Sequence, residues 1–160
     1  MRYCILYKNN LNMLKKFLFL GLFSFTFAEE EPKESAFPTA DGQNIVVTYD
    51  SDLSKLKFVA TVGENKYFSV GFGSSMINTD MILFTASGEG SVQDMYSTGY
   101  EAPPPDTVQN LEDISVEIDQ GVYTFTCYRA LDTGDAQDFV VELEKEFPII
   151  WAEQSDTSSL

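Results

Sequence analysis

The chain has 160 residues and a formal charge of −15, with 25 acidic side chains against ten basic ones. Such a charge repels nucleic acid and anionic membrane surfaces, so neither is an expected partner. None of the 160 residues is histidine, which excludes histidine-dependent catalytic triads and the usual zinc and copper sites.

Residues 1–28 have the order of a secretory signal peptide. Two lysines at positions 15 and 16 precede an apolar run over residues 17–27, which is followed by Ala28. A run of this length is too short to span a membrane as a helix, which takes about 20 residues. We therefore predict cleavage before Glu29, a secreted or secretory-pathway location, and no stable membrane insertion of the product. The sequence leaves open whether Met1 or Met13 is the start.

Cleavage would leave 132 residues with six basic and 25 acidic side chains, a formal charge of −19 and enough chain for one domain. Residues 29–43 are acidic and aperiodic and predict a flexible leader. Cys127 would be the single remaining cysteine, so no internal disulfide can form and stability must come from core packing. We expect Cys127 to be a small buried hydrophobe, with a reactive thiol as the alternative.

From Asn44 onward the chain has the pattern of a β protein. Short segments rich in Val, Ile, Phe, Tyr and Thr alternate with Gly, Asn, Asp and Pro turns, and no segment keeps helical spacing. The pattern predicts an all-β fold, an immunoglobulin-like antiparallel β-sandwich of about nine strands over residues 44–152, with a polar tail over 153–160. The expected strands are residues 44–50, 55–62, 66–72, 80–86, 91–97, 113–119, 122–131, 138–143 and 147–152.

Three connections have recognisable chemistry. "VGENK" and "DQG" contain the Gly and Asn residues that tolerate positive φ, so both are expected to be hairpin turns. "APPPDTVQNL", residues 102–111, predicts a loop or an edge crossing, because three successive prolines remove donors that a central strand needs. In "EDISVEID", the alternation predicts that Ile114, Val116 and Ile118 face the core.

Arg129 is the first candidate for a functional residue, because it shares an apolar strand face with Phe125 and Cys127. A guanidinium there is costly unless it is paired, and a cluster of aspartates, Asp132, Asp135 and Asp138, follows closely. The favoured interpretation is a structural ion pair, and the alternative is a pocket cation for an anionic ligand. The aspartate cluster lacks the alternation and closing glutamate of a calcium loop, so no metal site is expected.

Met76 is the second candidate, because it lies in a turn between "GFGSS" and "INTD" where a core residue is not needed. Methionine is usually core filler, which is the expectation for Met81 and Met95 within their strands. At a loop position a thioether is instead able to ligate a soft metal or a haem iron. Both interpretations of Met76 remain open at this point.

The chain resembles a DOMON domain over residues 44–152. The similarity lies in several pieces in a fixed order rather than in any one motif. They are the aromatic-x-x-Gly-Phe entry at 68–72, Met76 with Asp80 four residues later, "VQDMYS", the proline loop with Asp106, "YRALDTGDAQD" and the closing "IIWA".

The resemblance implies an extracytoplasmic β-sandwich with a pocket for haem or a sugar. In haem-binding members of the family a methionine and a histidine ligate the iron, and the methionine position matches Met76. Without histidine, Met/His ligation of haem b is not available, and a haem held by Met76 alone remains. Phe72, Tyr96 and Arg129 are the further candidate pocket residues. No cytochrome, dehydrogenase or copper monooxygenase segment is recognisable, so a redox role would require a separate partner.

Three functions follow as alternatives. The first is a secreted, non-catalytic module that binds a carbohydrate or haem-type small molecule at one end of the sandwich. The second is a haem-b electron-transfer protein with Met76 as an axial ligand, and the third is an adhesion or structural domain that contacts extracellular proteins. No enzymatic activity is expected, because no acid, base or nucleophile stands in a recognisable arrangement.

Overall fold

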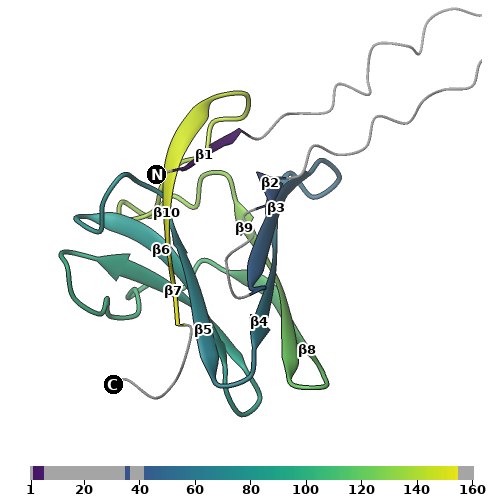
Figure 1. The fold of residues 1–160 in the computed structure, drawn as a ribbon. Coiled ribbons are helices and arrows are strands. Elements are labelled where there is room, and N and C mark those ends of the chain that lie inside the picture. Colours follow the sequence, from purple (N-terminus) through teal and green to yellow (C-terminus); the bar gives the residue numbers. More distant parts are fainter. Residues whose placement is uncertain (1, 6–34, 37–41, 155–160) are drawn as a thin grey trace, which may run out of the picture.

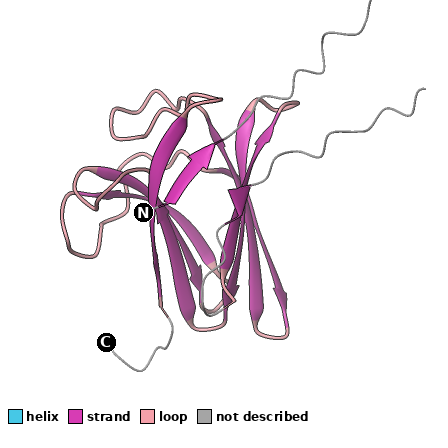
Figure 2. Ribbon diagram, turned by 45° about the horizontal axis from the view of Figure 1, so that its top comes forward, coloured by secondary structure: helices cyan, strands magenta, loops and turns pink. Residues whose placement is uncertain are grey.

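The computed structural model describes residues 2–5, 35–36 and 42–154. The predicted cleavage site before Glu29 and residues 155–160 of the predicted tail lie outside the described residues, as does most of the predicted leader. Within the described part, the protein consists of strands and loops only, which confirms the predicted all-β class (Figure 2). No helix in these stretches has the length and apolar character to cross a membrane.

Two antiparallel five-stranded sheets form a β-sandwich (Figure 1). The first sheet has the order β1-β10-β5-β6-β7 and the second has the order β2-β3-β4-β9-β8. β1 and β2 are short pieces that pair with the edges of β10 and β3. The strands are β1 (Arg2–Ile5), β2 (Ser35–Ala36), β3 (Asn44–Asp50), β4 (Lys55–Gly63), β5 (Lys66–Gly71), β6 (Thr79–Ala86), β7 (Ser91–Ser97), β8 (Glu112–Asp119), β9 (Val122–Ala130) and β10 (Glu146–Glu153).

The core lies between the facing sheets and follows directly from the alternation of side chains along the strands. Leu56, Phe58, Ala60 and Val62 of β4 are fully buried, while the residues between them are half-exposed. The same alternation holds on β9, where Phe125 and Cys127 face inward. Aromatic rings fill the space, and fully burying one such side chain contributes about 1.5–3 kcal/mol. The prediction that Cys127 is a buried hydrophobe is confirmed.

Of the two predicted hairpin turns, one joins strands of the same sheet and the other joins the two sheets. Gln120 and Gly121 both have positive φ (48° and 80°) and connect the paired strands β8 and β9. Asn65 also has a positive φ of 58°, but β4 and β5 belong to different sheets. The second turn therefore closes one end of the sandwich, which the local sequence does not distinguish from an ordinary hairpin.

The proline segment runs along the free edge of β7, as its composition predicts. Met95 and Pro105 form an isolated bridge, and Asp106 N donates to Asp94 O at 2.8 Å. The Gln109 side chain takes the place of a strand backbone, because its Oε1 accepts from Asp94 N (3.0 Å) and its Nε2 donates to Asp94 O (2.8 Å). Thus the backbone of Asp94 is held from the edge side by a side chain and a loop.

Two expected strand features differ from the structure. Residues 138–143 form an irregular segment instead of a ninth strand, because side chains take the backbone hydrogen bonds of Phe139: its N donates to Asp80 Oδ2 and its O accepts from Arg129 Nη2. On β8, Ile114 and Ile118 are 47% and 53% exposed, so they do not face a closed core. β8 is an edge strand with an irregular register between Glu112 and Ser115.

Gly90 provides a test of how closely the sheets pack. It has a φ of +78°, and a Cβ at this position would lie 2.9 Å from Val116 Cγ1 and 3.0 Å from Phe125 Cε1. Gly88, with a φ of +60°, has nothing within 4 Å of such an atom. Both Gly→Ala changes should cost about 1–2 kcal/mol for the left-handed backbone. Gly90→Ala should cost about a further 1–3 kcal/mol for overpacking, as measured by urea unfolding. Equal losses for the two variants would contradict the tight packing around Gly90.

Candidate ligand groove and the buried aspartate–arginine cluster

A groove of about 670 Å³ lies over the outer face of the first sheet, within the usual size range of small-molecule sites. It is formed on β10, β5, β6 and β7, and by the loops that follow β5 and β7. Its lining residues are Asn65, Lys66, Tyr67, Ser69, Met76, Met81, Leu83, Thr85, Ser87, Met95, Tyr100, Glu101, Ala102, Pro103, Ala152 and Gln154. The groove therefore runs along a sheet face, whereas the sequence predicted a pocket at one end of the sandwich.

The floor of the groove is set by the period of two along β6 and β7. Ile82 and Phe84 face the core. Met81 and Leu83 alternate with them along β6, so the side chains of Met81 and Leu83 point outward. Met81 is only 2% exposed because it is packed against neighbours on the sheet. A Cβ on Gly71 would lie 3.1 Å from Met81 Cγ, so the glycine leaves room for this side chain.

The loop after β5 brings Met76 to the groove. Phe72 N donates to Asp80 O at 2.9 Å and closes the base of the loop. Thr79 Oγ1 donates to Ser75 O at 2.6 Å, and Asn78 takes a positive φ of 51°. These bonds fix a short loop in which Met76 is half-buried and lines the groove. Three thioethers, those of Met76, Met81 and Met95, thus line one site.

The groove has few charged groups. Lys66 is the one cationic side chain and Glu101 the one carboxylate among the lining residues. Tyr67 and Tyr100 supply two aromatic faces, and Tyr100 is 77% exposed at the mouth. An apolar floor with thioethers, two phenol rings and one charge of each sign suits a largely apolar ligand that carries a polar edge.

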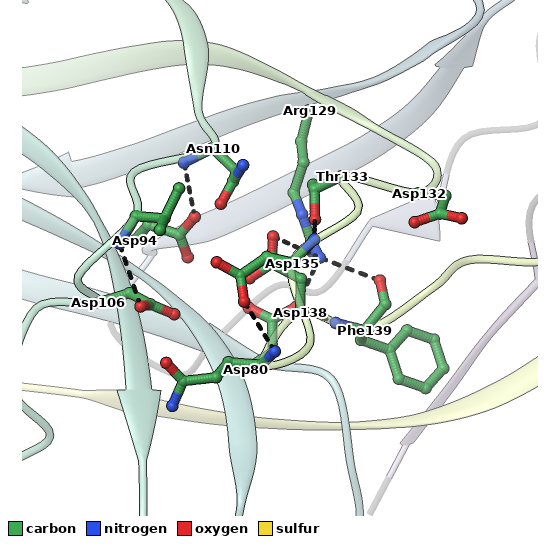
Figure 3. Close-up of polar contacts among 12 residues, drawn as sticks. Asp80, Asp94, Asp106, Asn110, Arg129, Asp132, Thr133, Asp135, Asp138 and Phe139 are labelled. Carbon is green, nitrogen blue, oxygen red and sulfur yellow. Dashed lines mark hydrogen bonds and ion pairs between the residues drawn. The ribbon is translucent and has the colours of Figure 1, made fainter.

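A second site lies on the inner side of the same strands, around Arg129 (Figure 3). Arg129 is 1% exposed, and its Nη2 lies 2.7 Å from Asp80 Oδ2 and 3.6 Å from Asp138 Oδ2. The same nitrogen donates to Phe139 O at 3.0 Å. The guanidinium carbon stands 5.1 Å from the centre of the Phe72 ring. These contacts confirm a structural ion pair for Arg129, with Asp80 as the main partner.

The cluster holds more negative than positive charge. Asp80, Asp94 and Asp138 each place a carboxylate oxygen within 4.8 Å of the others. Burial raises the pKa of Asp80 to about 6, although the Arg129 charge and the Phe139 N–H act in the opposite direction. Burial also raises the pKa of Asp94 to about 7, against the hydrogen bond from Asn110 N. Near neutral pH the cluster therefore retains part of its protons.

The cluster also affects Cys127. Burial raises the pKa of this thiol to about 12, and the neighbouring Asp94 charge adds to the shift. A thiol with a raised pKa is a weak nucleophile because the thiolate is the reactive form. Cys127 is therefore a packing residue at this position.

The structure separates the residues that the sequence proposed for one pocket. Met76 lines the groove, but Phe72, Tyr96 and Arg129 do not. Phe72 and Arg129 are buried between the sheets at 6% and 1% exposure. Tyr96 pairs with Asp80 in register and has the parity of the inner face.

The sequence did not single out Asp80 and Asp94 as partners of Arg129. Of the three aspartates proposed from sequence, only Asp138 lies near the guanidinium. Asp132 and Asp135 instead hold their own turns, through Gly134 N at 2.9 Å and Gln137 N at 2.9 Å. The sequence did contain a signal for this cluster. Asp80, Asp94 and Arg129 are each a charged residue at a strand position that the alternation of side chains directs inward.

Fold and sites together define an antiparallel β-sandwich module with a groove on one sheet and a buried polar cluster beneath it. The DOMON domain family model matches residues 41–154. The chain belongs to the DOMON family, which confirms the resemblance found in the sequence. Domains of this family are typically extracellular and bind small ligands such as haem or sugars.

One solved structure to which this chain is similar is the cytochrome domain of cellobiose dehydrogenase from Myriococcum thermophilum. The two chains share 13% identity, and their superposition has a TM-score of 0.43. The match covers 63% of this chain and 62% of that chain, so it spans less than two thirds of either protein. No curated protein sequence matches this chain.

The Arg129 ion pair should be essential for stability. Replacing Arg129 with Met leaves buried carboxylates without their cation, and we expect a loss of about 3–5 kcal/mol in the free energy of unfolding. Lys55→Met is the matched control, because the Lys55–Glu112 pair (2.7 Å) lies at the surface and should contribute little. Urea unfolding of both variants measures the difference. A loss for Arg129→Met no larger than that for Lys55→Met would contradict this role.

The raised pKa values of Asp80 and Asp94 predict a stability that falls as pH rises. A carboxyl whose folded pKa exceeds its unfolded value of about 4 stabilises the fold at low pH, and this contribution is lost as pH rises through the folded pKa. Between pH 5 and pH 8, in buffer free of divalent cations, Tm should drop by on the order of 10 °C. Asp94→Asn, which cannot ionise, should flatten this profile in thermal unfolding. A Tm that is constant or rises over this range would contradict the assignment.

Proposed function

We propose that this protein is an exported, non-catalytic DOMON module that binds a haem-type ligand in the groove over β10, β5, β6 and β7. The observation that carries the proposal is the set of three methionines, Met76, Met81 and Met95, on one apolar groove. Thioethers are soft donors that suit a haem iron. Apolar walls suit the ring of such a ligand, since burial of apolar surface is the main favourable term in its binding.

The donor set fits haem in a restricted way. Met76, on the loop, would supply a sulfur ligand to the iron, and Met81 and Met95 form part of the apolar floor. Lys66 would attract a carboxylate at the edge of the ligand. No imidazole is available anywhere in the 160 residues, so thioether sulfur is the soft donor that the described lining residues offer. Bound haem would supply one-electron redox chemistry. The protein would exclude water from the haem and supply the sulfur ligand of the iron.

The preference of thioether sulfur for soft ions has a consequence for affinity. Ferrous iron is softer than ferric iron, so a site with methionine and without histidine should hold reduced haem more tightly than oxidised haem. Tyr67 and Tyr100 would contact the ring face or edge. The side chains at the groove orient the ligand and shield it.

Binding without turnover is supported by the small number of charged groups in the groove. Its lining holds one carboxylate, Glu101, and one amine, Lys66, in a largely apolar surface. Catalysis by acid and base would require a pair of titrating groups placed around a reacting atom. The strongly shifted carboxyls, Asp80 and Asp94, are buried between the sheets and do not line the groove.

Haem titration tests the proposal. The protein, expressed without haem, should give a shifted Soret band on addition of dithionite-reduced haem, with one site per chain. Met76→Leu removes the sulfur at nearly constant volume and should weaken binding about tenfold or more. A tenfold change in Kd corresponds to roughly 1.4 kcal/mol of binding free energy. Ile77→Leu is the matched control, because Ile77 is exposed in the same loop and does not line the groove.

Two outcomes would contradict this function. Absence of any spectral change with reduced haem would reject a haem-type ligand. A Soret band that Met76→Leu leaves unchanged would reject Met76 as the axial donor. Screening of the same protein on a glycan array would show whether Tyr67 and Tyr100 serve a carbohydrate instead, the second ligand class of this family.

A further inference from the structure

We propose that the free side of β8 docks an extended segment of a partner protein in which apolar and basic residues alternate. β8 is the last strand of the second sheet (Figure 1), and within the described part of the chain only β9 pairs with it. The free side of an edge strand presents backbone N–H and C=O groups to which a further strand is able to hydrogen-bond. Such strand addition is a recurring mode of peptide recognition.

The other edges of the two sheets are short or covered. The proline segment runs along β7, where Met95 and Pro105 form a bridge. β1 and β2, which pair with β10 and β3, have only four and two residues. β8 has eight residues, none of them proline or lysine, the residue types that commonly block a free edge. No described backbone group outside β9 hydrogen-bonds to it. β8 is therefore the long accessible edge of the described sandwich.

Apolar side chains of β8 remain exposed on the face that is directed toward the first sheet. Val116 and Ile118 lie opposite Phe125 and Tyr123 of β9, which are buried, so they share the inner face of the sheet. Ile118 is nevertheless 53% exposed and Ile114 is 47% exposed. Covering such surface is favourable by about 25 cal/mol per Å². Apolar side chains of an added strand would gain this contribution.

The opposite face of β8 is acidic. Glu117 and Asp119 lie opposite Thr124 and Val122 of β9, and all four residues line a hollow of about 440 Å³. Among the described residues, neither Glu117 nor Asp119 has an ion-pair partner. A lysine or arginine of the partner would supply the opposite charge. Because successive residues of a strand point to opposite faces, the two faces together select alternating apolar and basic residues.

Charge also decides against a second copy of this chain as the occupant. The formal charge of −15 makes two copies repel each other. Antiparallel pairing of two β8 strands would bring their acidic side chains together, and like charges on facing strands are destabilising. The groove belongs to the first sheet, so docking at β8 is independent of the proposed haem-type ligand.

Fluorescence anisotropy with the full chain and synthetic peptides tests the docking site. The probe is acetyl-KVKVKVK-amide, and the control, acetyl-KKKKVVV-amide, has the same composition and charge without the alternation. The alternating peptide should bind at least about tenfold more tightly, because only this peptide matches both faces as a strand. It should also slow hydrogen exchange of the β8 amides. No binding, equal affinity for the two peptides, or binding without slower exchange in β8 would each reject strand addition.

Charge reversal tests the acidic face. Glu117→Lys combined with Asp119→Lys should weaken binding of the alternating peptide at least about tenfold. Glu142→Lys combined with Glu144→Lys is the matched control, because it changes the net charge equally at exposed positions before β10. Equal losses in the two double variants would show that only the overall charge of the protein attracts the peptide, and the site would be wrong.

Ile118→Asn tests the apolar face without a change of charge. It should weaken binding of the alternating peptide several-fold, whereas Ile77→Asn, at a position 49% exposed in the loop after β5, should leave binding unchanged. Sedimentation of the free chain tests the alternative occupant. A dimer that Ile118→Asn dissociates would assign this edge to a second copy and reject the basic partner.

Discussion

The buried ion pair between Arg129 and Asp80 is the interaction around which this end of the sandwich is built. Arg129 belongs to β9 of the second sheet and Asp80 to β6 of the first, so their 2.7 Å contact joins the two layers directly. The same two side chains bind the backbone N and O of Phe139. The irregular segment over residues 138–143 is thereby fixed against the core, with the Phe139 ring stacked on Phe72.

The alternation of side chains along the strands lets the first sheet carry two different sites. Successive residues of a strand point to opposite faces. On β6, Asp80 faces inward to Arg129 while Met81 faces outward to the groove, and on β7 Asp94 and Met95 divide in the same way. The polar cluster thus lies on the inner side of β6 and β7, and the outer side of the same strands forms the methionine floor of the groove. A shift of the backbone of these strands would act on both faces, because the two residues of each pair are adjacent in the chain.

The sequence predicted the class of fold well, because alternation and turn chemistry are local properties. Eight of the nine expected strands are present as β3–β10, and the family assignment is confirmed. The prediction failed for residues 138–143, since a side chain 59 residues earlier, Asp80, takes the backbone bond of Phe139. It also placed Phe72 and Arg129 with Met76, although they lie on opposite sides of the first sheet. Sequence spacing carries no information on such pairings between distant strands.

The amino-acid sequence by itself determined that this protein is a β-sandwich, that Arg129 faces the core, that Met76 lies in a loop and that no imidazole ligand is present. These features follow from the two-residue period of the strands and from composition, which are local properties that do not depend on how distant segments pair. Only the tertiary structure decided which carboxylates surround Arg129 and which methionines share the groove. The reason is physical: Asp80, Asp94 and Asp138 come from three different parts of the chain, and their proximity is created by strand pairing and sheet packing.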